Sequence, residues 1–319
     1  MKHKRNVVIL GILLLLALTV VCLYLFVPLR GNIAYILRLR THKVLAITLT
    51  GAAIAYATVV FQTITNNRIL TPSIIGMDSV YQLFQTIMVF FWGSTTLQFV
   101  DQQINFVVTV VLMIGFALVL YQALFRKDGT NLHFLLLMGI VMGTLFGSLT
   151  TFLQVIIDPN EYAGLQSRLF ASVSRVNANL LILGGGLMIP VMLYGLRYVR
   201  ALDAIALGRD HAINLGVDYG RVIKRMLVLV AVLMAAATAL VGPITFLGLL
   251  VANISYHMLD TYRRGPLIAA AIAVSVVFLL GAQLIMERVF VYSTPVSVIV
   301  NFIGGVYFLY LVLKERTAW

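Results

Sequence analysis

The residue types that carry most protein chemistry are few and scattered in this chain. Its five histidines, at positions 3, 42, 133, 211 and 257, share no metal-binding spacing, and its single cysteine, Cys22, excludes a disulfide within the chain. It contains neither a phosphate-cradling G-x-x-x-x-G-K-[ST] segment nor a placeable Ser/His/Asp grouping. The sequence therefore predicts no catalytic residue, no metal site and no cofactor bound by this chain.

Proline and glycine interrupt the apolar sequence at two comparable places. Residues 71–76 read TPSIIG after one apolar run, and residues 242–248 read GPITFLG after another. Inside a bilayer, backbone groups freed by such breaks are tolerated only where protein or a watery cavity satisfies them. Paired breaks in two halves of a chain are typical of internal repeats around a transport path, although two breaks can also arise by chance.

Small and polar residues near these breaks form a second set of candidates. Gly139, Gly143 and Gly147 lie four residues apart, so they share one face of a helix and permit close backbone approach. This pattern is compatible with ordinary helix packing and with a small-residue wall along a path or a dimer seam. The full set for a translocation path or helix packing is Pro72, Gly76, Asp78, Gly139, Gly143, Gly147, Thr151, Pro243, Gly248 and Asn253.

The longest polar connection, residues 199–221, contains two Leu-Gly pairs eight positions apart. Glycine commonly follows the end of a helix, so the pattern predicts two short helices. Such a connection can be a solvated loop or a docking knob for a cytoplasmic partner.

The elements that must position these residues are membrane helices. Hydrophobic residues make up 61% of the 319 positions, charged residues only 11%, and the mean hydropathy is +1.01. A soluble enzyme of this size cannot hide so much apolar surface, and a membrane helix needs about 20 apolar residues. We predict one all-α transmembrane domain over 1–319 with about ten spans, at 7–27, 43–63, 74–92, 104–125, 131–157, 178–198, 222–241, 246–259, 266–286 and 296–313.

Basic residues give these spans an orientation. The net charge is +12, and with both termini inside, 16 of the 23 Lys and Arg residues fall in inner segments and seven in outer ones. The positive-inside rule therefore favours N-in and C-in topology, and no basic stripe suggests nucleic acid as a partner. Four of the outer charges, Arg30, Arg38, Arg40 and Lys43, cluster before the second span, which topology alone does not explain.

An ordered set of segments resembles the permease subunits of iron–siderophore ABC importers, the type II group that includes the vitamin B12 permease. The matching pieces are the two Leu-Gly pairs within 207–217, GPITFLGL at 242–249, TPV at 294–296 and IGGVYFLY at 303–310. The first half adds GAAIA at 51–55 and TPxxxG at 71–76. Together these segments cover most of the chain in the family's order.

The resemblance implies a ten-helix permease in the cytoplasmic membrane of a bacterium, working beside a second permease that is identical or paralogous. Two cytoplasmic ATPase subunits would bind ATP and Mg and drive alternating access. An extracytoplasmic binding protein would deliver a ferric siderophore. This chain would perform no covalent chemistry and would not be an enzyme.

The resemblance also implies roles for particular residues. The family's coupling connection to the ATPase corresponds to Leu207, Gly208, Ala212, Leu215, Gly216 and Val217. Its basic contacts to the binding protein, an R-x-x-R pattern just before the second helix and a residue before the last helix, correspond to Arg40, Lys43 and Arg288. Departures from the family at 77–81 and 252–253 resemble the branch that imports catecholate or mixed siderophores such as petrobactin or anguibactin.

Two other classes compete with this interpretation. A secondary transporter or channel would need no ATPase, but such carriers usually hold acidic residues at mid-membrane, and Asp78, Asp260 and Glu287 all lie near predicted span ends. An intramembrane enzyme would need a buried catalytic group, which the sequence does not supply. Transport by the purified chain in liposomes without nucleotide would favour a carrier.

Overall fold

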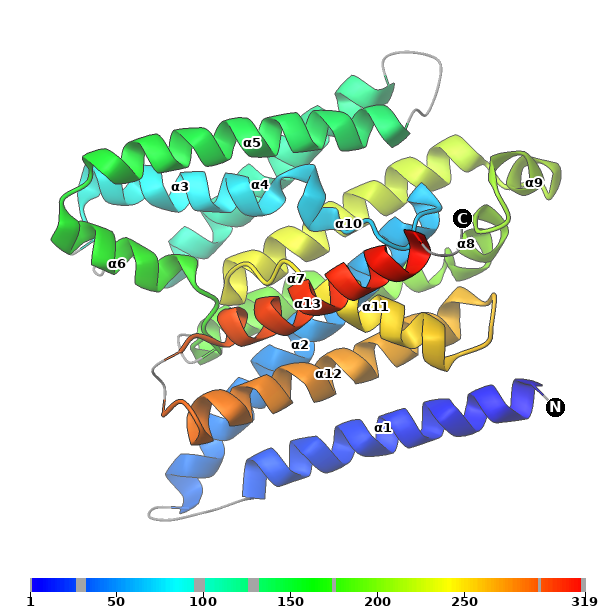
Figure 1. Cartoon of the computed structure of the whole chain (residues 1–319), viewed down its shortest axis with the longest axis horizontal. Coiled ribbons are helices and arrows are strands. Elements are labelled where there is room, and N and C mark those ends of the chain that lie inside the picture. Colours follow the sequence, from blue (N-terminus) through cyan, green and yellow to red (C-terminus); the bar gives the residue numbers. More distant parts are fainter. Residues whose placement is uncertain are drawn as a thin grey trace.

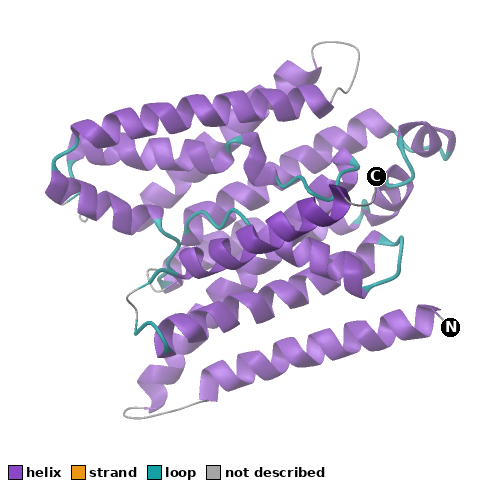
Figure 2. Ribbon diagram, in the orientation of Figure 1, coloured by secondary structure: helices purple, strands orange, loops and turns teal. Residues whose placement is uncertain are grey.

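A computed structural model describes residues 2–26, 33–94, 101–125, 132–173, 176–291 and 294–316. In these ranges every regular element is a helix (Figure 2). The elements are α1 (Lys2–Phe26), α2 (Ile33–Thr65), η1 (Pro72–Ile75), α3 (Met77–Trp92), α4 (Gln102–Phe125), α5 (Leu132–Ile156), α6 (Pro159–Leu169), α7 (Ala178–Leu196), α8 (Val199–Ile205), α9 (Arg209–Asn214), α10 (Tyr219–Val241), α11 (Leu247–Met258), α12 (Arg264–Arg288) and α13 (Val296–Arg316).

Each predicted apolar span coincides with one of these helices, namely α1 to α5, α7 and α10 to α13. Among the described residues, seven helices are long and apolar enough to cross a membrane, and α11 and α13 are shorter apolar helices. A helix satisfies its own backbone hydrogen bonds, which lipid cannot do. The all-α membrane fold is therefore confirmed.

The start of the second span was predicted wrongly. Helix α2 begins at Ile33, ten residues before the expected position, so Arg40 and Lys43 lie within the helix rather than just before it. Apolar periodicity stops at the basic residues, whereas arginine and lysine are good helix formers and extend the helix beyond the apolar run.

Helix α6 was not predicted, because its sequence is polar. Its start nevertheless carries ordinary signals: the Asp158 side chain accepts a hydrogen bond from the backbone N–H of Asn160, and Pro159 occupies the first helical position. The helix lies in the connection between α5 and α7.

Helix α2 forms the centre of the bundle and packs most extensively on α10 and α12. Small residues allow this contact, since residues 51–55 are buried and a methyl group added at Gly51 would lie 2.9 Å from Oγ of Ser275 in α12. Helix α1 packs on the outside of α12, and α5 covers α3 on the opposite side of the molecule (Figure 1).

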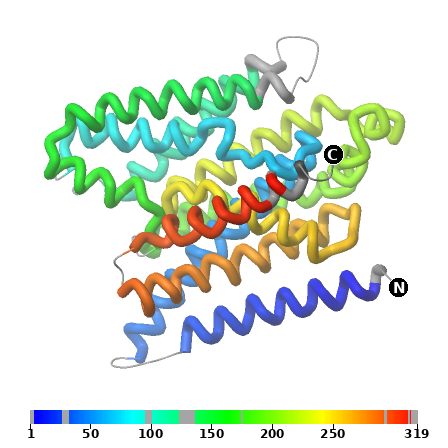
Figure 3. The backbone as a smooth tube through the Cα atoms, in the orientation of Figure 1, coloured from blue at the N-terminus to red at the C-terminus, as the bar shows by residue number. Residues whose placement is uncertain are grey.

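The start of α1 and the end of α13 lie at the same end of the bundle as α8 and α9 (Figure 3). Helix α6 lies at the opposite end (Figure 1). This arrangement separates a terminal end, with the α8–α9 connection, from an α6 end. Four residues of the charge count, Arg30, Arg126, Lys127 and Arg175, lie outside the described residues.

Candidate functional site

The two broken segments meet inside the bundle. Oγ1 of Thr245, in the second segment, donates a 3.0 Å hydrogen bond to the Asp78 carboxylate, which follows the first segment by two residues. Gly76 and Gly242 adopt φ angles of +88° and +107°, a region that favours glycine. Pro72 and Pro243 are buried beside them. The sequence predicted the two breaks. The structure brings the segments 71–76 and 242–248 together through Asp78 and Thr245, and this contact is called the crossing below.

Two of the three α5 glycines pack against this crossing. A methyl group added at Gly139 would lie 2.7 Å from Cα of Ile75, and one added at Gly143 would lie 3.3 Å from Cα of Gly76. At Gly147 the same methyl group would meet no described atom within 4 Å, and the neighbouring Thr151 is exposed. Gly139 and Gly143 thus serve packing, whereas Gly147 and Thr151 lie on an open face.

Helix α11 extends the crossing through two further predicted residues. Gly248 lies directly against the Thr58 side chain of α2. Asn253 is buried, and its Nδ2 donates to the backbone oxygen of Arg68 at 3.0 Å and to that of Leu249 at 2.9 Å. Asn253 therefore ties α11 to the segment that follows α2.

The 199–221 connection forms the two short helices, α8 and α9, that its glycines predicted. Gly216 ends α9 with a φ of +81°, while its backbone N–H bonds the Ile213 oxygen and that of Val217 bonds the Ala212 oxygen. This pair of bonds is a Schellman motif, which needs a left-handed residue at its centre. Gly208 precedes α9 with a φ of +107°.

The α8–α9 connection presents an apolar surface to solvent. Leu207 is 57% exposed and Leu215 64% exposed, whereas Ala212 is fully buried and anchors α9. A methyl group at Gly208 or Gly216 would meet no described atom within 4 Å. The two exposed leucines give this short, tightly closed helix pair a protruding apolar surface, called the knob below.

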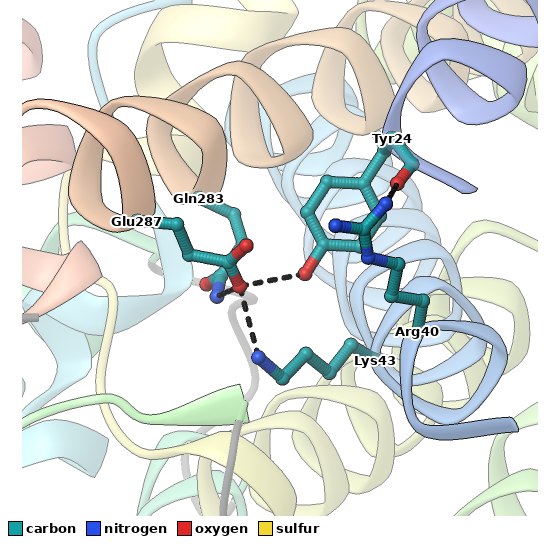
Figure 4. Close-up of polar contacts among 5 residues, drawn as sticks. All are labelled: Tyr24, Arg40, Lys43, Gln283 and Glu287. Atoms are coloured by element: carbon teal, nitrogen blue, oxygen red, sulfur yellow. Dashed lines mark hydrogen bonds and ion pairs between the residues drawn. The ribbon is translucent and has the colours of Figure 1, made fainter. Parts of the chain in front are cut away.

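Two of the predicted docking residues contact neighbouring helices (Figure 4). Nζ of Lys43 lies 2.9 Å from Oε1 of Glu287, with only 19% and 11% of the two side chains exposed. The same carboxylate oxygen accepts hydrogen bonds from the Tyr24 hydroxyl and from Nε2 of Gln283, both at 2.7 Å. Lys43 therefore joins α2 to α12 and, through Glu287, to α1.

Arg40 lies one helical turn before Lys43. Its Nη1 donates to the backbone oxygen of Tyr24 at 3.0 Å and to that of Leu25 at 3.3 Å, and its guanidinium lies over the Tyr24 ring. It thus caps the carbonyl end of α1, where a cation is favourable. Arg288, at the end of α12, is exposed.

Sequence reasoning missed two groups of residues. Glu287 lies more than 240 residues from its partners Tyr24 and Lys43, so no local pattern reveals the cluster. The second group lines a cavity of about 330 Å³ between α3, α4, α6 and α7, and includes Arg168. The only signal for Arg168 was its place among the outer basic residues.

The geometry defines a class of protein. Long apolar helices, a buried crossing of two broken segments and an exposed helical knob at one end are features of multi-pass transport subunits that work with a partner. The chain itself brings together no group that could perform catalysis among its described residues. A match to a family model identifies the subunit more closely.

Residues 7–314 match the FecCD transport family, and the chain belongs to this family. It is 51% identical to the petrobactin import system permease protein YclO of Bacillus subtilis (strain 168), over 97% of this chain and 98% of that protein. It is 36% identical to the petrobactin import system permease protein FatC of Bacillus anthracis, over 88% of this chain and 79% of that protein.

The fold is also similar to solved structures. A metal-chelate type ABC transporter in an inward-facing conformation superposes with a TM-score of 0.82 at 22% identity, covering 97% of this chain and 99% of that chain. The family match shows that the chain is a multi-pass permease subunit of an ABC importer in the bacterial cytoplasmic membrane, and not an enzyme. ATPase and substrate-binding partners are general features of such importers.

Proposed function

We propose that this chain carries a ferric siderophore of the petrobactin class across the cytoplasmic membrane. The 51% identity to a petrobactin import permease over nearly the whole of both chains is the observation that carries the proposal. A second petrobactin permease relative at 36% identity supports the same substrate class. The sequence departures at 77–81 and 252–253 agree with this branch of the family.

The proposed topology has ten membrane helices with both termini in the cytoplasm. The start of α1 and the end of α13 lie at the same end of the bundle as α8 and α9, which supports it (Figure 3). So does the excess of basic residues in the segments assigned to the inside. The α8–α9 connection then faces the cytoplasm, and α6 faces outward.

The α8–α9 knob is the proposed contact with the ATPase. Leu207 and Leu215 supply apolar surface, while the Gly216 turn and buried Ala212 hold the knob in shape. ATP and Mg would be bound by two partner ATPase subunits and not by this chain. Motion of the ATPase pair would reach the bundle through α10, which begins five residues after Asn214.

The permease is proposed to work as a pair with an identical or paralogous permease. The open face of α5, with Gly147 and Thr151, and the exposed apolar residues Phe302 and Leu309 of α13 are the surfaces proposed for the seam and the path. A helix of the second permease could approach α5 closely at Gly147, because no described side chain covers this residue.

An extracytoplasmic binding protein is proposed to dock at the α6 end through Arg40, Lys43 and Arg288. Complementary charge would steer docking and fix its register. Exposed Arg288 supports this role directly. Lys43 would serve docking while paired with Glu287, so its contribution to the fold must be separated from its contribution to the partner.

Uptake of iron-55-labelled ferric petrobactin tests the function. The full chain is reconstituted in liposomes with its co-purified permease, ATPase and binding protein, and uptake is followed with and without ATP. The expected result is ATP-dependent uptake that disappears when the ATPase is omitted. Uptake by this chain alone without nucleotide would instead establish a secondary carrier or channel.

A further inference from the structure

A polar cavity inside the protomer adjoins the crossing of the broken segments, because Gly242 is one of its lining residues. It has a volume of about 330 Å³ and lies between α3, α4, α6 and α7, with the end of α10 as its floor. Pockets of small ligands start at about 300 Å³, and a water molecule occupies roughly 30 Å³ of liquid, so the cavity has room for a small ion with part of its hydration.

Arg168 of α6 is the only charged residue that lines the cavity in the described part of the chain. Its side chain is half-buried and forms no ion pair with a described residue. Glu161, the carboxylate-bearing residue of α6, is not among the residues that line the cavity, although its carboxylate accepts a hydrogen bond from the backbone N–H of Ser94, which does line it.

Hydrogen-bonding side chains line the same cavity as this cation. Gln85 of α3 and Asn105 of α4 contribute carboxamides, and Ser172 contributes a hydroxyl. The Tyr81 hydroxyl donates to the backbone oxygen of Arg168 at 3.3 Å, and the backbone N–H of Ser172 donates to the Val241 oxygen at 2.8 Å. These bonds fix the lining in place. Nε2 of Gln85 also donates to Oγ1 of Thr109 at 3.4 Å, which leaves its second N–H, the Asn105 carboxamide and the Ser172 hydroxyl to donate to a ligand.

A half-buried guanidinium without a counter-charge is unfavourable. Burial lowers the pKa of Arg168 from its ordinary value, because the charged form loses hydration there. A bound anion would compensate for that loss, and guanidinium pairs best with planar carboxylate or with phosphate. Neutral donors on α3 and α4 would complete the coordination of such an anion.

We propose that this cavity binds a small oxyanion, a carboxylate or phosphate, between Arg168 of α6 and the polar side chains of α3 and α4. The bound anion would join α6 to α3 and α4 at the outer end of the bundle. The proposal does not depend on the transported substrate or on the ATPase, since the cavity lies wholly within one chain.

Thermal unfolding of the full purified chain tests the site, with acetate, inorganic phosphate or chloride added at constant ionic strength. The expected result is a saturable rise in melting temperature with acetate or phosphate but not with chloride. The response to each of the two oxyanions shows which class is preferred. Equal responses to all three salts, or a rise that never saturates, would indicate general salt effects and overturn the proposal.

Three variants locate the effect. Arg168→Gln should weaken oxyanion affinity by about ten- to a hundredfold, the range for a charged hydrogen bond. Arg38→Gln, which removes an exposed arginine of α2, is the matched control and should keep the wild-type response. Asn105→Asp places a carboxylate in the cavity and should abolish the response. If Arg168→Gln does not fold, an unchanged response in Asn105→Asp is sufficient to refute the site.

Discussion

Glycine serves two different purposes in the buried crossing and in the α8–α9 connection. In the crossing, Gly139 lies so close to Ile75 that a side chain has no space. In the connection, Gly216 has open space around it, but its φ of +81° is one that other residues adopt only under strain. One region needs glycine because of its neighbours, and the other because of its own backbone.

The same residue type can therefore have opposite consequences for folding and function. Filling the crossing displaces two packed backbones, so the whole bundle should respond. Changing the connection alters a surface knob that no described helix covers, so the fold should persist while partner contact changes.

Gly139→Leu should prevent accumulation of folded protein. The added side chain would collide with the backbone of η1, and overpacking of this kind costs about 3 kcal/mol or more where backbone cannot move. Size-exclusion chromatography of a fluorescent fusion in mild detergent measures the folded fraction. Gly115→Leu on α4, where a methyl group meets no described atom within 4 Å, is the control and should elute as wild type. A monodisperse Gly139→Leu peak would remove the steric argument.

Gly216→Val should leave the fold intact but uncouple ATP hydrolysis from uptake. A left-handed backbone costs a non-glycine residue roughly 1–2 kcal/mol, so the Schellman turn should open and move Leu215. We expect uptake by the reconstituted importer to fall about tenfold while ATPase activity and melting temperature change little. Gly220→Ala, in the first turn of α10, is the control. Wild-type uptake by Gly216→Val would make the connection an ordinary loop.

Thr245→Val should destabilise the crossing without filling it. The substitution keeps the volume but removes the hydrogen bond to the buried Asp78 carboxylate, at a cost of about 1–3 kcal/mol. The melting temperature in detergent measures the loss. Thr144→Val, on the exposed face of α5, is the matched control and should have little effect. Equal melting temperatures would show that shape alone holds the crossing.

Arg288→Glu should weaken binding-protein docking and leave the fold unchanged. An exposed charge acts mainly on the association rate, so we expect a reduction of several fold that fades as salt rises. Surface-plasmon resonance against the binding protein measures the association rate at low and at high salt. An unchanged association rate at low salt would exclude Arg288 from docking.

Lys43→Gln tests a basic residue that is paired inside the fold, in contrast to exposed Arg288 at the same end of the molecule. Loss of the half-buried pair with Glu287 should lower the melting temperature, because the carboxylate keeps only its bonds to Tyr24 and Gln283. A variant that melts as wild type but docks weakly would instead assign Lys43 to the partner surface alone.

The sequence predicted those parts of the molecule that depend on local composition. Apolar runs located the membrane helices, and the two Leu-Gly pairs located α8 and α9. It could not predict that Lys43 pairs with Glu287, 244 residues away, since packing alone decides which helices are neighbours. The Arg168 cavity was missed for the same reason, because its lining comes from separate helices.

The contacts of helix α1 affect the order in which the helices of this chain pack together. Arg40 of α2 contacts its end early, but its two side-chain anchors lie far along the chain: Tyr24 bonds Glu287, and Arg5 pairs with Asp260. During synthesis at roughly 5–20 residues per second, α1 would wait about 13 to 50 s in the bilayer before α12 emerges. Its exposed apolar residues, between Val7 and Phe26, suit it to face lipid for that time with α2 as its early neighbour. The first helix made is therefore among the last to find its place.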